Sequence, residues 1–233
     1  MALLRSILFH LVFYPASALI ATSIMLSAPF SADNVRRGSH IWAAWFVWCC
    51  RVCLGIKLAV RGRIPNESVI VASKHSSAYE TLLTLYLFHH PAVVMKAELR
   101  KIPVWGWLAA RHGSIFVARN KAGSALKSMI RQARARSAEG RPVFIFPEGT
   151  RVPVGQTPPL KAGLYGIYAG LHVPVVPVAH NAGLLWTKGF VKHAGTVTVS
   201  FLPEIAADLP REEMEALVHA AINLDPLTAE VRD

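Results

Sequence analysis

The sequence has few cysteines, and their placement argues against a disulfide framework and against a zinc site. Its three cysteines, Cys49, Cys50 and Cys53, lie in one apolar stretch without histidine–cysteine metal spacing around them. An odd number of thiols inside an apolar run is typical of side chains that only pack. We therefore expect neither a disulfide framework nor a zinc site, and no bound metal or other cofactor.

Acidic residues are also scarce. The chain of 233 residues carries 14 Asp and Glu against 25 Lys and Arg, a formal charge of +11, while 53% of its residues are hydrophobic. Anionic lipid headgroups attract basic side chains, and apolar segments enter the acyl layer. The combination favours a membrane surface as partner. Binding to nucleic acid would explain the basic charge but not the apolar start of the chain, so we expect no nucleic-acid partner.

No charged residue occurs between Ser6 and Ala32, a run long enough to cross a bilayer, which takes about 20 residues. Pro15 predicts a kink or break in this helix. A polar turn is expected at 33–39, followed by a second apolar segment at 41–54. A cleaved signal peptide is the less favoured alternative, because the second apolar segment follows at once.

Three tryptophans spaced three apart give the second segment the character of an interfacial helix: Trp42, Trp45 and Trp48. Residues 1–60 are therefore predicted to form a membrane-anchoring helical hairpin. Basic residues flank both segments on every side, so the charge pattern leaves open whether the hairpin crosses the bilayer or is embedded in one face.

Short apolar runs alternate with longer amphipathic ones after Gly62. Strands are predicted at 68–72, 92–95, 114–118, 142–146, 173–178 and 196–202, and helices at 77–88, 122–138 and 211–222. This order indicates an α/β domain over 61–233, with a mainly parallel central sheet flanked by helices. No internal repeat or low-complexity segment interrupts it.

His75 and Glu80 stand where a predicted strand gives way to a helix. Ligands of open α/β sheets gather at the carboxyl ends of strands. The two side chains can meet only if His75 lies in the turn and Glu80 in the first turns of the helix, and the carboxylate would then orient the ring. The alternative is a capping box in which Glu80 reaches back to the Ser77 amide.

The run Phe146-Pro147-Glu148-Gly149-Thr150-Arg151 also follows a predicted strand. Its proline and glycine favour a turn, so Glu148 and Arg151 are expected to project from a loop. Arg119 ends another predicted strand, and Lys161 is expected to begin the next helix. Arginine matches phosphate oxygens in charge and geometry, so two such strand ends can converge on one anion. The alternatives are a surface Glu–Arg pair and a solvated strand terminus.

A serine-nucleophile hydrolase needs a Gly-x-Ser-x-Gly elbow between strand and helix. No such pentapeptide occurs in the sequence. Ser76 and Ser77 adjoin His75 without fitting that elbow, which argues against hydrolysis through an acyl-enzyme.

Taken together, these segments resemble the lysophosphatidate acyltransferase family of 1-acyl-glycerol-3-phosphate acyltransferases, over roughly residues 60–203. The four blocks of that family appear in order: His75 with an acidic residue after four variable positions, Gly113 to Arg119, Phe146 to Arg151, and Val173 to Val178 around a proline. Two positions depart from the family pattern. Glu80 stands where aspartate is usual, and Lys74 stands where a small or amide residue is common. The longer glutamate requires an adjusted backbone or rotamer.

The resemblance implies an enzyme of phospholipid biosynthesis at the bacterial inner (cytoplasmic) membrane, with its catalytic domain facing the cytoplasm. His75 would take the proton of the 2-hydroxyl of lysophosphatidic acid, oriented by Glu80, and the oxygen would attack the thioester of acyl carrier protein or CoA. The resemblance assigns the phosphate pocket to a further set: Arg119, Glu148, Gly149, Thr150, Arg151 and Lys161. Lys74 would add charge near the phosphate.

Two other functions fit parts of the sequence. Transfer to another acceptor, such as glycerol 3-phosphate or a lyso-amino-lipid, uses the same motifs. A non-enzymatic basic membrane protein would explain the charged stripe on helix 122–138, formed by Lys127, Arg131 and Arg134. Such a binder has no need of His75 and Glu80 together with the 146–151 run.

Overall fold

A seven-stranded, mainly parallel sheet organises the protein, with strand order β1-β7-β6-β2-β5-β3-β4. The structure, a computed structural model, describes residues 1–88, 90–118 and 122–233. The strands are β1 (Ile56–Arg61), β2 (Ile70–Ser73), β3 (Ala92–Lys96), β4 (Ile115–Val117), β5 (Val143–Ile145), β6 (Val175–His180) and β7 (Gly195–Phe201). Only the β6–β7 pair is antiparallel among the pairings of the described strands. The predicted α/β class is confirmed.

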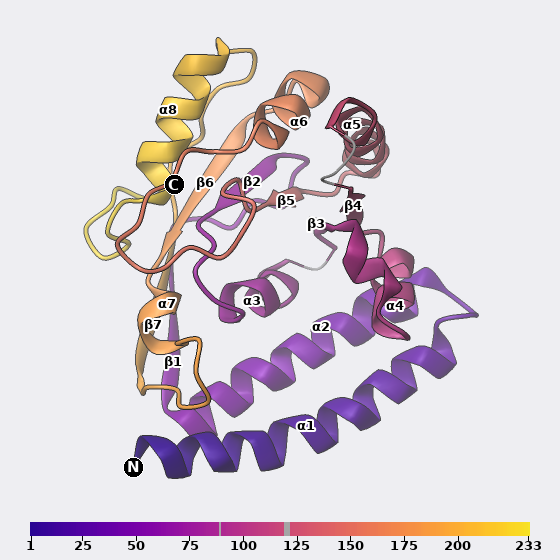
Figure 1. Ribbon diagram of the computed structural model, residues 1–233, viewed down its shortest axis with the longest axis vertical. Coiled ribbons are helices and arrows are strands. Elements are labelled where there is room, and N and C mark those ends of the chain that lie inside the picture. Colours follow the sequence, from indigo (N-terminus) through magenta and orange to yellow (C-terminus); the bar gives the residue numbers. More distant parts are fainter. Residues whose placement is uncertain (89, 119–121) are drawn as a thin grey trace.

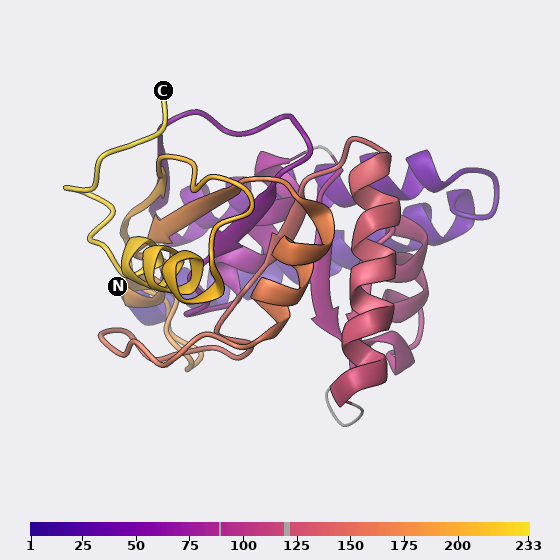
Figure 2. The same cartoon turned by 90° about the horizontal axis from the view of Figure 1, so that it is seen from above.

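Helices cover both faces of the sheet (Figures 1 and 2). They are α1 (Ala2–Ser27), α2 (Ala32–Cys49), α3 (Tyr79–Leu87), α4 (Trp105–His112), α5 (Ala122–Ala138), α6 (Gly163–Leu171), α7 (Ala182–Leu185) and α8 (Arg211–Ile222), with a π turn at Cys50–Leu54 and a 3-10 turn at Ala97–Lys101. The predicted helices at 122–138 and 211–222 match α5 and α8. The sequence patterns did not predict β1, α4 or α7.

Alternation along the central strand β2 explains why both faces are covered. Val69 and Val71 point into a core shared with α1, α2 and α3, whereas Ile70 and Ala72 point into a second core under α5, α6 and α8. All four side chains are buried, and a strand buried on both faces reads as a continuous apolar run. Figure 2 shows α5, α6 and α8 on one side of the sheet and the N-terminal helices behind it.

The N-terminal hairpin differs from its prediction in two ways. Helix α1 runs through Pro15 without ending, because one lost backbone hydrogen bond leaves the rest of the helix intact. The predicted polar turn at 33–39 is wrong, since these residues form the first turns of α2. Ser31 is the N-cap and its side chain accepts a hydrogen bond from the Asp33 amide, and Asp33 itself sits favourably at the positive end of the helix dipole.

The hairpin also packs into the core of the sheet domain. Phe9, Phe13 and Phe46 share one buried cluster with Tyr79 and Trp186. The predicted boundary between residues 60 and 61 falls inside β1, which pairs with β7 in the sheet. In the described part of the chain, α1 alone is long and apolar enough to cross a membrane by length and composition. The three cysteines are buried and unpaired.

Strand β2 brings the motif-bearing segments to one edge of the sheet. It lies between β5 and β6, parallel to both, with Ala72 opposite Ile145 and Ser73 opposite Val178. The carboxyl ends of all three strands therefore lie at the same end of the sheet. This edge is where ligands bind in open α/β sheets.

Candidate active site

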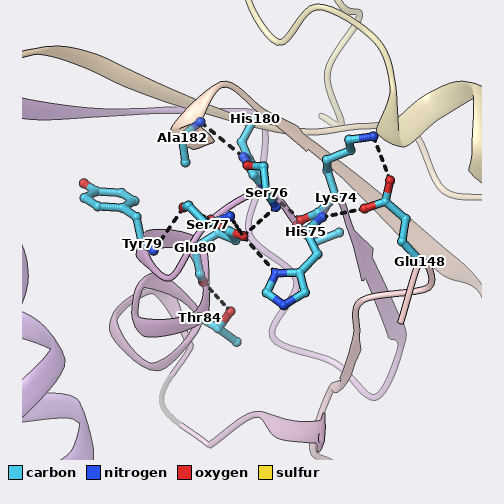
Figure 3. Close-up of polar contacts among 11 residues, drawn as sticks. Lys74, His75, Ser76, Ser77, Tyr79, Glu80, Thr84, Glu148, His180 and Ala182 are labelled. Carbon is cyan, nitrogen blue, oxygen red and sulfur yellow. Dashed lines mark hydrogen bonds and ion pairs between the residues drawn. The ribbon is translucent and has the colours of Figure 1, made fainter. Parts of the chain in front are cut away.

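His75 and Glu80 meet directly at the carboxyl edge of the sheet (Figure 3). The Nδ1 atom of His75 lies 2.9 Å from Oε1 of Glu80. His75 follows β2 in a short turn and Glu80 is the second residue of α3, the arrangement that a five-residue offset requires. A carboxylate accepts only, so Nδ1 carries the proton and donates it to Glu80. In the neutral ring the lone pair is then on Nε2.

The same carboxylate also closes the turn that precedes α3. Its Oε1 atom accepts hydrogen bonds from the amides of Ser76 at 2.8 Å and Ser77 at 2.6 Å. The Ser77 hydroxyl donates to Oε2 and accepts from the Tyr79 amide at 3.1 Å. The capping box and the histidine pair were alternatives for the sequence. The structure combines the histidine pair with the predicted contact from Glu80 back to the Ser77 amide, because one ionised carboxylate has enough lone pairs for all these donors. The N-cap of α3 is Ala78 rather than Ser77, and the Ser77 hydroxyl accepts from the Tyr79 amide, so the reciprocal half of the capping box is not formed.

Glu80 is held in its ionised form. Its burial alone would raise the pKa of the carboxyl, but the His75 hydrogen bond, the nearby His180 and the Ser77 hydroxyl together lower that pKa to about 2. The residue is 3% exposed. A buried anion next to Nδ1 orients the ring and stabilises the imidazolium when the ring takes a proton.

Phe146 holds the other side of the imidazole. The two rings stack with centroids 4.1 Å apart and 22° between their planes. The His75 side chain is 16% exposed, and none of the residues that the structure describes hydrogen-bonds its Nε2 atom. The ring is thus fixed by a carboxylate at its edge and an aromatic ring on its face, while Nε2 has no protein partner among the described residues.

The 146–151 run also holds the backbone of His75. The His75 amide donates to Oε2 of Glu148 at 2.9 Å, and the His75 carbonyl accepts from the Val152 amide at 2.7 Å. Both main-chain groups of the histidine are therefore bound by the loop after β5. These contacts join two motifs that are far apart in the sequence.

Glu148 does not project from its loop as predicted. Its side chain is fully buried, and its Oε1 atom accepts from Nζ of Lys74 at 2.7 Å. Among the described residues there is no ion pair between Glu148 and Arg151, so the surface pair that was the alternative interpretation is not formed. Lys74 lies beside β2 with its charge turned inward rather than toward the solvent. The reason is the short distance between the ends of β2 and β5, which makes the two residues neighbours.

His180 belongs to the site and was not identified from the sequence. Its Nε2 atom donates to the Lys74 carbonyl at 2.8 Å, and its Nδ1 atom accepts from the Ala182 amide at 3.3 Å. These partners fit the neutral ring, with the proton on Nε2. A histidine at the end of β6, next to the strand that carries His75, was the available signal.

The remaining predicted binding residues lie on the loop after β5. Gly149 has a φ of +71°, the left-handed region that glycine adopts without strain. Thr150 and Arg151 are exposed, and no ion pair ties the Arg151 side chain to a described residue. Lys161 is exposed, and its amide donates to the Pro147 carbonyl at 2.8 Å. It precedes α6 rather than beginning it.

Arg119, predicted to share the anion with Arg151, lies outside the described residues. The exposed cation Arg151 and the His75 ring nevertheless lie at the same end of the sheet, since Val152, next to Arg151, donates a hydrogen bond to the His75 backbone. Within residues 1–88, 90–118 and 122–233, no group of three or more His, Cys, Asp or Glu side chains is placed to hold a metal ion.

Neither neighbouring serine is arranged as a nucleophile. The Ser77 hydroxyl donates to Glu80, so His75 is not its acceptor. The Ser76 hydroxyl is buried without a hydrogen-bond partner in the part of the chain that the structure describes. A base that is not paired with a nucleophilic side chain is suited to activating a hydroxyl of the substrate.

Comparison with known proteins agrees with this geometry. The family model described as Acyltransferase matches residues 56–181, more than half of the chain, starting at the first residue of β1. A 1-acyl-sn-glycerol-3-phosphate acyltransferase of Pseudomonas aeruginosa is 34% identical over 210 residues, covering 88% of this chain and 82% of that protein. A protein of the same name from Borreliella burgdorferi is 32% identical over 155 residues, covering 63% of this chain and 62% of its own.

The fold has a counterpart among solved structures. The 1-acyl-sn-glycerophosphate (LPA) acyltransferase PlsC of Thermotoga maritima superposes with a TM-score of 0.69 at 21% identity, covering 95% of this chain and 93% of that one. At this identity the likeness concerns the fold. The family match includes His75, Glu80 and the 146–151 run, and with the identity to the Pseudomonas enzyme it shows that the chain belongs to the acyltransferase family.

Proposed function

We propose that this protein transfers an acyl group from a thioester to the 2-hydroxyl of 1-acyl-sn-glycerol 3-phosphate, giving phosphatidic acid. The observation that carries the proposal is the contact between His75 and Glu80, which holds Nδ1 as a donor and leaves Nε2 to act as the base. The relatives named 1-acyl-sn-glycerol-3-phosphate acyltransferase supply the substrate class.

In the proposed reaction, Nε2 of His75 takes the proton of the acceptor hydroxyl as its oxygen attacks the thioester carbonyl. The tetrahedral intermediate collapses, the carbon–sulfur bond breaks, and the thiolate takes the proton back from the imidazolium. Glu80 keeps Nδ1 as a donor throughout and stabilises the positive ring between the two transfers. Phe146 prevents the ring from turning away during the cycle.

The phosphate of the acceptor is proposed to bind the loop after β5. Arg151 and Lys161 offer exposed cations there, and Thr150 offers a hydroxyl. Gly149 allows the backbone to turn sharply between the buried Glu148 and the exposed Thr150. Arg119 is retained as a further phosphate ligand in this proposal. Glu148 contributes by holding the His75 backbone rather than by contacting the substrate.

The donor is proposed to be acyl-acyl carrier protein or acyl-CoA, and the site of action the cytoplasmic face of the bacterial inner membrane. The exposed apolar side chains of α1 support membrane attachment: Leu4, Leu8, Leu11, Leu19 and Leu26. Attachment would keep the active site at the interface, where a lysolipid acceptor resides and a diacyl product must return.

The proposal is tested by incubating the purified full-length protein in detergent micelles with lysophosphatidic acid and either acyl-CoA or acyl-acyl carrier protein. Mass spectrometry should detect phosphatidic acid, and His75→Ala should lower kcat by about 10²–10⁴-fold, the usual contribution of a general base. Glycerol 3-phosphate and a lyso-amino-lipid serve as alternative acceptors. Faster turnover of either, or near wild-type turnover by His75→Ala, contradicts the proposal.

A further inference from the structure

We propose that Lys74 is a positioning residue of the acyl transfer reaction: it holds Glu148 as a buried anion, and through Glu148 it sets the backbone of His75. The inference rests on the proposed function, and it assigns Lys74 a role other than charge near the substrate phosphate. It also makes the end of helix α8 part of the active-site structure.

Every donor of the Lys74 ammonium has a protein acceptor. Nζ lies 2.7 Å from Oε1 of Glu148, 2.6 Å from the Gln156 carbonyl and 2.6 Å from Oδ1 of Asn223. Lys74 is 8% exposed. An ammonium has three protons, so none remains for a substrate phosphate. Its position next to His75 in the sequence therefore does not make it a phosphate ligand.

The ion pair acts on the catalytic region through the second oxygen of Glu148. This oxygen accepts from the His75 amide at 2.9 Å, and Val152 of the same loop donates to the His75 carbonyl at 2.7 Å. A hydrogen bond to an ionised acceptor is about twice as strong as one between neutral groups. The charge on Glu148 thus fixes the residue that carries the base.

Lys74 is the group that keeps this charge inside the protein. The Glu148 side chain is fully buried, and Lys74 is its ion-pair partner among the described residues. Loss of one partner from a buried pair leaves an uncompensated charge, which must take up a proton or move toward water. Either response weakens its bond to the His75 amide.

The other two acceptors tie distant segments to this pair. Asn223 is the C-cap of α8. Its side-chain Nδ2 atom donates to the His219 carbonyl at 2.7 Å, and this bond holds the Oδ1 atom of Asn223 toward Lys74. Gln156 belongs to the loop that carries Arg151. Lys74 therefore connects the end of β2, the loop after β5 and the end of α8 at a single atom.

The test compares Lys74→Met, Glu148→Gln and the double variant in the full-length protein. Methionine keeps an unbranched apolar side chain, and glutamine keeps an acceptor for the His75 amide. Each single variant leaves one buried charge unpaired, whereas the double variant has none. We expect Lys74→Met to lower kcat by about 10²-fold, a loss typical of a small displacement at a catalytic group, with little change in KM for the acceptor.

The double variant should turn over faster than either single variant. Amide hydrogen exchange of His75 and Val152 provides a second readout that needs no substrate: exchange should accelerate in Lys74→Met and slow again in the double variant. Amides of the β1–β7 ladder serve as an internal reference for global unfolding. Should Lys74→Met fail to fold, the comparison of Glu148→Gln with the double variant still carries the test.

Lys127→Met is the matched control, because Lys127 is exposed on α5 and the variant loses the same charge. It should retain the wild-type kcat and exchange rates. If Lys74→Met raises the KM for the acceptor and leaves kcat unchanged, Lys74 binds substrate and the proposal is wrong. If the double variant is no faster than the single variants, Lys74 does not act through Glu148. If the wild-type protein acylates no lysophosphatidic acid, the proposed function fails, while the exchange data still decide whether Lys74 positions His75.

Discussion

Glu80 binds the His75 ring and the turn before α3 with one and the same oxygen, Oε1. The His75 ring and the turn before α3 are therefore held by the same atom. The extra methylene of glutamate, relative to the aspartate usual in this family, is accommodated without losing the 2.9 Å contact to Nδ1. The turn before α3 is shaped around this carboxylate, because the amides of Ser76 and Ser77 both donate to the same Glu80 oxygen.

Variants at Glu80 should separate its two roles. Glu80→Gln keeps an acceptor for the turn but removes the negative charge beside the ring, so kcat should fall by about 10²-fold or more with a smaller loss of stability. Glu80→Ala removes both functions and should lower the free energy of unfolding by a further ~1–2 kcal/mol, the usual cost of a lost helix cap. Steady-state kinetics and thermal unfolding measure the two effects. Equal stability of both variants would contradict the capping role.

Stability should depend on pH through the same carboxyl. Its pKa is about 2 in the folded protein against an ordinary value of 4.5, so the stabilisation is fully present above pH 4.5 and is lost as the pH falls toward 2. The amount is on the order of 3 kcal/mol, because one pKa unit corresponds to about 1.4 kcal/mol. Chemical denaturation between pH 2 and 5 should give a shallower slope for Glu80→Gln than for the wild type. Parallel slopes would place the acid sensitivity elsewhere.

Arg151 should act on acceptor binding. Arg151→Ala should lower kcat/KM for lysophosphatidic acid by roughly 10–100-fold, mainly through KM, since hydrogen bonds to charged groups contribute about 1.5–3 kcal/mol. Arg151→Lys should lie between, because lysine keeps the charge but loses the planar fork. The matched control is Arg131→Ala on α5, an exposed arginine with the same change in charge. An unchanged acceptor dependence in Arg151→Ala would remove it from the phosphate site.

The N-terminal hairpin should contribute to the stability of the catalytic fold. Phe46 of α2 is 1% exposed and contacts Phe9, Tyr79 and Trp186, so Phe46→Ala should cost about 3–5 kcal/mol. Trp48 of the same helix is 49% exposed and serves as the control, with a much smaller loss expected for Trp48→Ala. Thermal unfolding in detergent micelles compares them. Similar losses would show that the hairpin is held mainly by its outer face.

The α/β class, and the contact between His75 and Glu80 as one of two alternatives, could be predicted from residue types and their spacing. Hydrophobic periodicity predicts six of the seven strands and the helices α3, α5 and α8, because buried strands and amphipathic helices impose different spacings on apolar residues. The 33–39 segment was misread, since a helix N-terminus and a polar turn use the same residue types. The sequence pattern does not predict β1, because its first apolar residues follow almost directly on the apolar segment at 41–54.

The surroundings of His75 could not be predicted from local sequence patterns. The inward turn of Glu148, its pairing with Lys74 and the hydrogen bonds of His180 all join residues that are far apart in the sequence. Their meeting follows from β2 lying between β5 and β6 in a parallel sheet, a neighbour relation that local patterns do not encode. Residue type and spacing could identify a candidate base and its carboxylate. Which charges are buried and which face the substrate depends on how strands pack side by side, because burial is a property of the assembled fold.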